Sequence, residues 1–179
     1  GNVSDAKTIV NDILKENGKD LEGKYLGARI ALAEQRLDDA KALFREVVKE
    51  NPEMARARLY YGVTEIFQGC VDVGKTEVME AVKLDPGNTR ARLILGDLHL
   101  KMNMPAEAEK EAIEVLRRDP ANVQAAVLYG DSFLVRKDWK KAEQVYTALM
   151  KETPKSAMGY FKMGLSRKFQ GKPAEADPA

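Results

Sequence analysis

The chain has 179 residues, of which 44% are hydrophobic and 32% charged, a balance typical of a globular protein with a large helical surface. Its 29 basic and 28 acidic side chains leave a formal net charge of +1, so charge alone gives no reason to expect nucleic acid or an anionic membrane as partner. The single cysteine, Cys70, excludes an internal disulfide framework and a cysteine-based metal cluster.

The sequence contains no recognisable targeting or membrane segment. No apolar run approaches the roughly 18 residues that a membrane-spanning helix needs, and no signal peptide is present. Gly1 stands where a start methionine is expected, as after cleavage of a tag, so we expect any targeting segment to have been removed with the rest of a longer parent protein. Both cytoplasm and periplasm therefore remain open as compartments.

A period of 34 residues runs through the chain, and a fixed period of this kind is the signature of a repeat architecture. Four columns of equivalent residues keep the same step. They are the prolines Pro52, Pro86, Pro120 and Pro154; the small residues Ala6, Ala40, Gly74, Ala108, Ala142 and Ala176; the small residues Ala28, Gly62, Gly96, Gly130 and Gly164; and the apolar residues Ile13, Val47, Ala81, Val115 and Leu149.

The period predicts the order of elements along the chain. We expect a leading half repeat at 1–20 with a second helix at about 4–16, full repeats at 21–54, 55–88, 89–122 and 123–156, and a partial repeat at 157–179 with a first helix at about 157–170. In the third repeat, apolar residues of 89–102 recur at helical spacing. Pro105 then suits the first turn of a second helix, which ends at Asp119-Pro120, and Asn122 can cap the helix that follows.

The columns of small residues predict close contacts between helices. A residue without bulk on each helix of a pair lets the two backbones approach, and stacked repeats then bury a continuous core. Gly74 stands in a column of alanines, and a glycine inside a helix costs about 0.5–1 kcal/mol relative to alanine. We therefore expect Gly74→Ala to stabilise the fold.

These features resemble the tetratricopeptide repeat family over almost the whole chain. The resemblance rests on the 34-residue period, the alanine column, the closing prolines and the pairs Tyr61-Gly62, Leu95-Gly96, Tyr129-Gly130 and Met163-Gly164. It implies an all-α fold, a right-handed α-solenoid of helix-turn-helix repeats with about ten helices. The style of the repeats is similar to that of larger bacterial multi-repeat proteins.

No group of residues in the sequence indicates catalysis, a metal site or a cofactor. His99 is the single histidine and lies in an expected first helix, where a packed structural role is favoured. Cys70 follows a first helix without an evident base beside it, so a plain thiol is favoured over a nucleophile. Phosphate loops, nucleotide fingerprints and zinc motifs are absent from the sequence. We predict that the protein is not an enzyme.

The resemblance also implies where a partner binds. In this family the first helices line a concave groove, through the second, fifth, ninth, twelfth and thirteenth positions of each repeat. From those positions we predict the groove residues Tyr25, Arg29, Arg56, Leu59, Val63, Phe67, Arg90, Leu93, Asp97, Lys101, Val127, Asp131, Val135, Phe161 and Leu165. Other residues at these positions, such as Leu32 and Ile66, serve equally well to pack helix against helix.

The composition of this lining indicates the type of partner. It is mostly apolar, with arginines toward one end and two aspartates in the middle, which suits an amphipathic helix or an extended apolar peptide. Family members that clamp the C-terminal carboxylate of chaperones resemble one another in a lysine at the fifth position and an asparagine at the ninth. Pairs such as Leu59 and Val63 do not match that pattern.

The sequence therefore favours a protein–protein interaction scaffold that forms part of a larger multi-repeat protein. Two alternatives remain. One is a structural spacer in an envelope or export assembly, without a dedicated groove ligand. The other, less favoured because of the apolar lining, is a helical-repeat protein that binds nucleic acid. We also expect self-association, because the half repeats at 1–20 and 157–179 leave apolar faces uncovered, among them Phe161.

Overall fold

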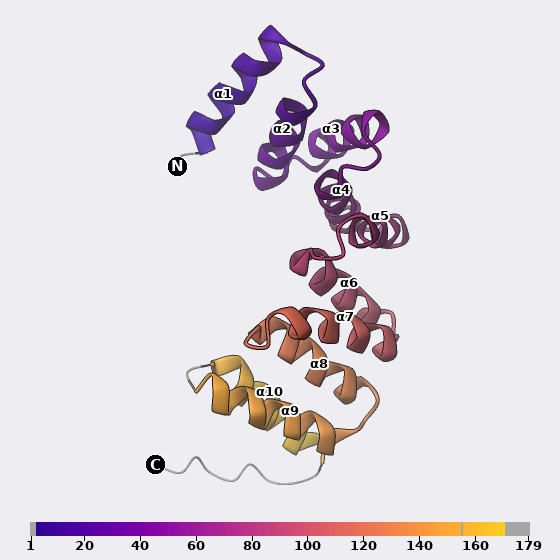
Figure 1. Cartoon of the computed structure of the whole chain (residues 1–179), viewed down its shortest axis with the longest axis vertical. Coiled ribbons are helices and arrows are strands. Elements are labelled where there is room, and N and C mark those ends of the chain that lie inside the picture. The colour runs from indigo at the N-terminus through magenta and orange to yellow at the C-terminus, as the bar shows by residue number, and fades with distance from the viewer. Residues whose placement is uncertain (1–2, 155, 171–179) are drawn as a thin grey trace. The chain divides into compact units, whose positions relative to one another are not determined.

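The structure is a computed structural model that describes residues 3–154 and 156–170. Within these residues it contains ten α-helices and no strand (Figure 1), which confirms the predicted all-α class. The helices are α1 (Val3–Glu16), α2 (Leu21–Ala33), α3 (Leu37–Glu50), α4 (Ala55–Phe67), α5 (Val71–Leu84), α6 (Thr89–Lys101), α7 (Pro105–Arg118), α8 (Val123–Val135), α9 (Trp139–Glu152) and α10 (Ala157–Phe169). Gly1 and Ala176, which the sequence analysis singled out, lie outside the described residues.

The helices follow the period seen in the sequence. First helices begin at Leu21, Ala55, Thr89, Val123 and Ala157, and second helices at Leu37, Val71, Pro105 and Trp139, each one period after the last. Capping side chains fix several of these starts: the predicted cap is confirmed at Asn122, whose side chain accepts a hydrogen bond from the backbone N–H of Ala125 at 3.0 Å. The proposed boundaries of the repeats themselves remain a prediction.

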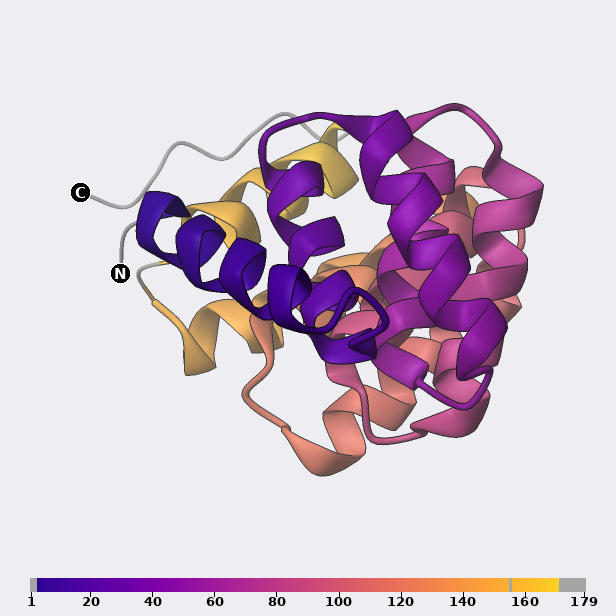
Figure 2. The same cartoon turned by 90° about the horizontal axis from the view of Figure 1, so that it is seen from above.

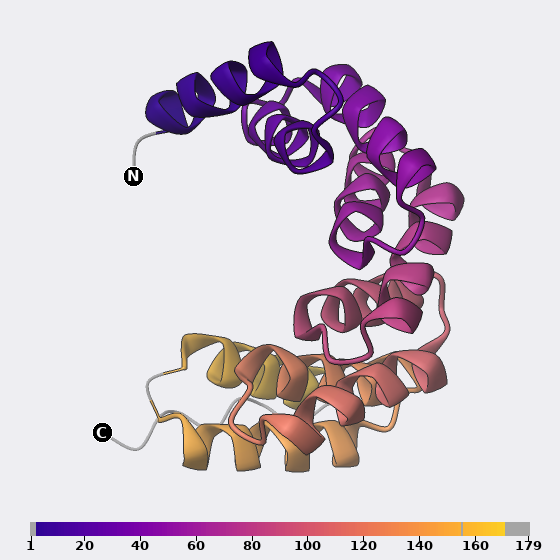
Figure 3. The same ribbon diagram turned by 45° about the horizontal axis from the view of Figure 1, so that its top comes forward.

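Two compact units, residues 1–91 and 92–179, are described separately. In unit 1 (residues 1–91), α2 contacts α3, α3 contacts α4, and α4 contacts α5; Figure 2 shows these helices by colour. In unit 2 (residues 92–179), α7 contacts α8, α8 contacts α9, and α9 contacts α10, the last pair in orange and yellow in Figure 3. Each unit therefore buries its apolar side chains between consecutive helices.

The turn between the two helices of a repeat has the same backbone conformation each time. The second residue of each three-residue turn has a positive φ: 59° at Gln35, 85° at Gly69, 58° at Asn103 and 61° at Lys137. The next residue donates its N–H to the carbonyl five residues back, at 2.8–2.9 Å, as from Arg36 to Ala31. This is a Schellman motif, which satisfies the last carbonyls of the first helix. Only Gly69 meets the left-handed conformation without a steric cost.

We predict that a residue other than glycine at the left-handed turn position lowers the free energy of unfolding. Gly69→Ala should lower the free energy of unfolding by about 1 kcal/mol, because a side chain in this conformation is strained. No atom lies within 4 Å of the Cβ that the change would add, so backbone strain is the only cost. Lys137→Gly should instead raise stability by about 0.5–1 kcal/mol. Urea denaturation measures both effects, and equal midpoints for wild type and both variants would contradict the interpretation.

The helices α4 and α5 of unit 1 approach each other closely at Gly62 and Gly74. A methyl group at Gly74 would lie 2.6 Å from the Gly62 carbonyl oxygen and 2.5 Å from Ile66 Cγ1, and a methyl group at Gly62 would lie 2.6 Å from the Gly74 carbonyl oxygen. Neither backbone can move away without separating the helices. The expectation that Gly74→Ala stabilises the fold is therefore wrong, because helix propensity is outweighed by this contact.

We now predict that Gly74→Ala lowers the free energy of unfolding by about 1–3 kcal/mol through overpacking. Gly164→Ala is the matched control, since Gly164 is an exposed glycine inside α10 with no atom within 4 Å of an added Cβ. Because nothing is overpacked at this site, Gly164→Ala should raise the free energy of unfolding by about 0.5–1 kcal/mol through helix propensity alone. The midpoint of chemical denaturation measures both effects. If both substitutions raised the midpoint, the packing argument would be wrong.

Candidate functional site

A cluster of two tyrosines and three arginines lies on the first helices of unit 1. Tyr25 and Arg29 come from α2, Arg56 and Tyr60 from α4, and Arg90 from the first turn of α6. Within α2 and α4 the two residues are four positions apart and thus share one face of the helix. The helices bring the rings together, with 6.2 Å between the centroids of Tyr25 and Tyr60.

The three guanidinium groups lie against these two rings. The Arg29 guanidinium carbon is 4.2 Å from the centroid of Tyr60 and 5.9 Å from that of Tyr25. The carbon of Arg56 is 4.8 Å from the Tyr25 centroid, and that of Arg90 is 5.1 Å from the Tyr60 centroid. These are cation–π distances, so both rings attract the arginines and hold them in place.

Hydrogen bonds add to this arrangement. Arg29 Nη1 donates to the Tyr25 hydroxyl at 3.3 Å, and Arg90 Nη1 donates to the Tyr60 hydroxyl at 3.0 Å. Arg56 forms an ion pair with Glu22 of α2. One of the three positive charges is therefore balanced by a carboxylate, and the other two contact neutral hydroxyl groups.

The predicted groove residues of unit 1 differ in how accessible they are. Arg29, Arg56 and Arg90 are exposed, and Phe67 at the end of α4 is 66% exposed. Val63 is half-buried, whereas Tyr25 and Leu59 are only 4% and 2% exposed and belong to the core between the helices. The buried pair can support a binding surface but cannot offer much area to a ligand.

In unit 2 a half-buried network surrounds Asp131. Its carboxylate accepts a hydrogen bond from the Tyr146 hydroxyl at 2.7 Å and pairs with Lys162 of α10 at 2.7 Å. Burial raises the pKa of Tyr146, and the negative charge of Asp131 and the hydrogen bond to it raise it further. The Tyr146 ring lies over Gly130, where an added Cβ would be 2.4 Å from the ring. Asp131 therefore serves the packing of α8, α9 and α10.

The remaining predicted groove residues of unit 2 are mostly accessible. Val135 and Phe161 are 37% and 65% exposed, and Asp97 pairs with Lys101 one turn further along α6 at 3.1 Å. The half-buried ones are Leu93, Val127 and Leu165.

Sequence reasoning missed Tyr60 and Lys162 as members of these clusters. Tyr60 sits at a position that was not among those assigned to the groove, although it follows Arg56 by one helical turn. The repeated stretch at 55–58 and 89–92, each with two arginines, was the available signal that positive charge gathers on neighbouring first helices.

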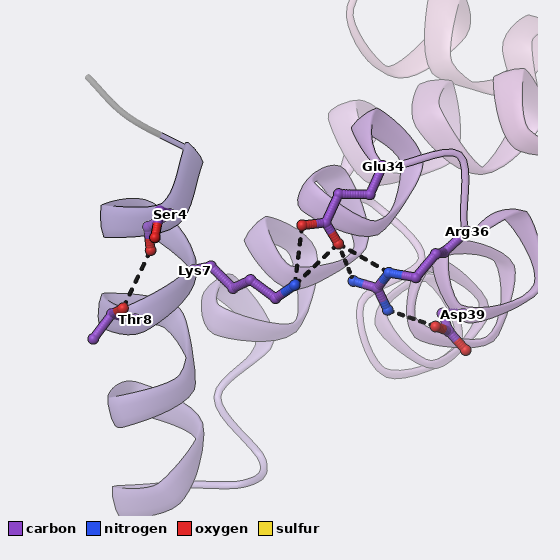
Figure 4. A network of polar contacts seen from close by, with 6 residues as sticks. All are labelled: Ser4, Lys7, Thr8, Glu34, Arg36 and Asp39. Atoms are coloured by element: carbon purple, nitrogen blue, oxygen red, sulfur yellow. Dashed lines mark hydrogen bonds and ion pairs between the residues drawn. The ribbon is translucent and has the colours of Figure 1, made fainter.

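A second polar network joins α1 to the turn between α2 and α3 (Figure 4). Lys7 Nζ donates to both oxygens of Glu34 at 3.0 and 3.1 Å, and Arg36 bridges Glu34 and Asp39. Hydrogen bonds from Lys7 and Arg36 lower the pKa of Glu34. The network lies at the surface, where ion pairs contribute little to stability, so it orients α1 and does not constitute a reactive site.

An ion pair with a buried carboxylate and a half-buried lysine lies between α3 and α4 of unit 1. Glu65 is 2% exposed, and its carboxylate accepts a hydrogen bond from Lys41 Nζ at 2.9 Å. Burial acts to raise the pKa of Glu65, but hydrogen bonds from Lys41, Tyr61 and Cys70 and the charge of Lys41 outweigh it, so that the pKa is lowered. In the next repeat the equivalent position holds His99, which is 7% exposed.

The described part of the chain shows neither a metal-binding group nor a membrane-spanning helix. Residues 3–154 and 156–170 contain no group of three or more histidine, cysteine or acidic side chains that could hold a metal ion. Over the same residues, every helix is too short or too polar to span a membrane.

Comparison with known families decides the classification. The sequence matches the tetratricopeptide repeat family over residues 25–69 and 93–157. The chain belongs to the tetratricopeptide repeat family. Members of this family generally mediate protein–protein interactions, and no curated protein sequence matches the chain significantly.

Solved tetratricopeptide repeat structures share the fold. YrrB, described as a TPR protein with an unusual peptide-binding site, is 15% identical with a TM-score of 0.77, over 92% of this chain and 85% of that one. The pilF protein of Pseudomonas aeruginosa is 20% identical with a TM-score of 0.79, over 96% of this chain and 78% of that one. A tetratricopeptide repeat protein from Parabacteroides merdae is 13% identical with a TM-score of 0.82, over 95% of this chain and 68% of that one. At these identities the likeness establishes the fold alone.

The Glu65–Lys41 pair should make the stability of this tetratricopeptide repeat chain depend on pH. Because the pKa of Glu65 is lower in the folded chain than in the unfolded one, the pair stabilises the fold above the ordinary glutamate pKa of about 4.3. This contribution is lost as the pH falls through the folded pKa. We predict that Glu65→Gln reduces the loss of stability between pH about 6 and 3.

Urea midpoints at several pH values measure this effect. Glu53→Gln removes an exposed carboxylate from the same unit and controls for the change in net charge. If Glu65→Gln and Glu53→Gln showed the same pH dependence, the Glu65–Lys41 pair would not be its source.

Proposed function

We propose that this chain is a protein–protein interaction module that binds a peptide or a helix of its partner on the surface of its first helices. The observation that carries the proposal is the exposure of Phe67. Ala57, Leu59 and Thr64 of α4 are closely packed and at most 2% exposed, whereas Phe67 exposes 66% of its surface. Because Phe67 also stands at a position predicted to line the groove, its accessibility supports a contact surface there.

The helical period places Phe67 on the same face of α4 as Arg56 and Val63. Val63 follows Arg56 by seven positions and Phe67 follows Val63 by four, and each step returns the side chain to nearly the same direction. Together with Arg29 and Arg90 they form the binding surface that we propose for unit 1. In unit 2 the accessible residues Val135 and Phe161 support an equivalent role for α8 and α10.

The family and a structural neighbour support binding over catalysis. Tetratricopeptide repeats generally bind other proteins, and YrrB is described as having a peptide-binding site. Of the alternatives, a structural spacer would leave Phe67 without a role. A nucleic-acid-binding role finds no support in the near-neutral charge of the chain.

Self-association remains a prediction for the C-terminal helix. One set of side chains of α10 is apolar and accessible: Met158 at 50%, Tyr160 at 47%, Phe161 at 65% and Phe169 at 56%. A second copy of the chain could cover this set, which burial of apolar surface would favour.

We predict that Phe67→Glu weakens peptide binding at least tenfold, because a charge at the centre of an apolar contact must be desolvated on binding. The measurement begins with selection of a displayed random dodecapeptide library on the wild-type chain. Fluorescence anisotropy then compares the affinities of enriched peptides for each variant. Met79→Glu is the matched control, since Met79 is 47% exposed on the second helix α5 and lies outside the proposed surface.

Two results would count against the proposal. One is the absence of any enriched peptide. The other is equal affinity of Phe67→Glu and Met79→Glu for the enriched peptides, provided that thermal melts show both variants folded.

A further inference from the structure

We propose that the binding surface of unit 1 recognises an acidic peptide segment, through carboxylates that pair with Arg29 and Arg90 beside the Arg56–Glu22 ion pair. This inference rests on the proposed function and specifies the chemistry of its ligand. It also differs from the apolar ligand that the sequence analysis favoured. Arginine is suited to this task because its planar guanidinium group donates two parallel hydrogen bonds to one carboxylate.

The arginines are positioned before any ligand binds. Tyr25 is 4% exposed and packs against Phe44, which is fully buried, with 6.2 Å between the ring centroids. Tyr60 stacks on Phe44 at the same centroid distance and an interplanar angle of 13°. The Tyr25 ring is thus part of the core and the Tyr60 ring packs against it, so the guanidinium groups of Arg29 and Arg90 rest on a rigid base. A ligand that binds them does not have to order long, mobile side chains.

Within residues 3–154 and 156–170, carboxylates balance the charge of the cluster only in part. Arg56 pairs with Glu22, but neither Arg29 nor Arg90 has a carboxylate within ion-pair distance among residues 3–154 and 156–170. Both lie on the ring of Tyr60, at 4.2 and 5.1 Å from its centroid, so the two guanidinium carbons are no farther apart than the sum of these distances. An anionic ligand would relieve the repulsion between them.

The other two basic residues of α2 and α4, Lys24 and Arg58, are already paired. Lys24 forms an ion pair with Glu46 at 2.7 Å, and Arg58 pairs with Glu77 at 2.7 Å. The positive charge available to a ligand is therefore concentrated at Arg29 and Arg90.

The surroundings favour an acidic peptide over nucleic acid. Residues 1–91 contain 14 basic and 16 acidic side chains, so unit 1 carries a net negative charge. A long polyanion would be repelled by most of this unit, because phosphate-backbone binding depends on many dispersed basic contacts. A short acidic segment needs only the local positive cluster.

The same surface also predicts an apolar residue in the ligand. Arg56 and Phe67 lie on one face of α4, eleven positions apart, which corresponds to roughly 16 Å along the helix. An extended peptide covers this distance in about five residues. We therefore expect acidic residues and a large apolar residue separated by about that number of positions.

The test is a comparison of peptide selections. The random dodecapeptide library is selected on the wild-type chain, on the double variant Arg29→Gln/Arg90→Gln and on the matched control Arg45→Gln. Arg45 is an exposed arginine of unit 1 on the second helix α3. Wild type and Arg45→Gln should enrich peptides with two or more aspartates or glutamates and an apolar residue about five positions away. The double variant should lose the acidic preference.

A second measurement leaves the protein unchanged. An enriched peptide with its glutamates replaced by glutamine should bind the wild-type chain at least tenfold more weakly in fluorescence anisotropy, and the difference should shrink as salt is added. Enrichment of peptides without acidic residues, or equal affinity of the glutamate and glutamine peptides, would overturn the acidic preference and leave peptide binding intact. Enrichment of no peptide on any chain would overturn the proposed function as well.

Discussion

The fold depends on how closely the two helices of a repeat can approach. A helix pair of this length has too little apolar surface to be stable alone, so each pair must pack tightly and then stack on its neighbours. The contact of Gly62 with Gly74 shows the limit of that approach, since each backbone occupies the place of the other residue's Cβ. In the first repeat the same two columns hold Ala28 and Ala40, both completely buried. The side chains above and below these points, such as Phe44 and Val47, fill the space that remains.

Most of the fold could be predicted from the sequence because the period is carried by several independent columns. The helix starts keep that period, and the cap at Asn122 was recognisable from its residue type and position. The effect of Gly74→Ala could not be predicted, because helix propensity is a local property and the nearest obstacle, the Gly62 carbonyl, comes from another helix. The left-handed turns were also missed, since glutamine at 35 and lysine at 137 give no local signal for that conformation.

The candidate site could be predicted only in part, for a similar reason. Positions counted along a repeat identified the helix faces, and the arginines and Phe67 on those faces are indeed exposed. The position within a repeat could not reveal that Leu59 is buried by neighbouring helices. It also could not show that the Asp131 carboxylate accepts a hydrogen bond from Tyr146 and pairs with Lys162. Nor could it reveal that guanidinium groups from three helices share the rings of Tyr25 and Tyr60. Those properties arise from side-chain packing between repeats, which a position within one repeat does not contain.

The contact between Tyr146 and Gly130 has a consequence for how this chain can vary. The tyrosine ring fills the space beside a residue without a side chain, and its hydroxyl reaches Asp131 at the next position. A larger residue at position 130 would displace the ring and break that hydrogen bond, while a smaller residue at position 146 would leave a cavity beside the glycine. The three positions are therefore expected to change together among descendants of this sequence, so that exchange of a single helix between related chains would succeed only when α8 and α9 are transferred as one block.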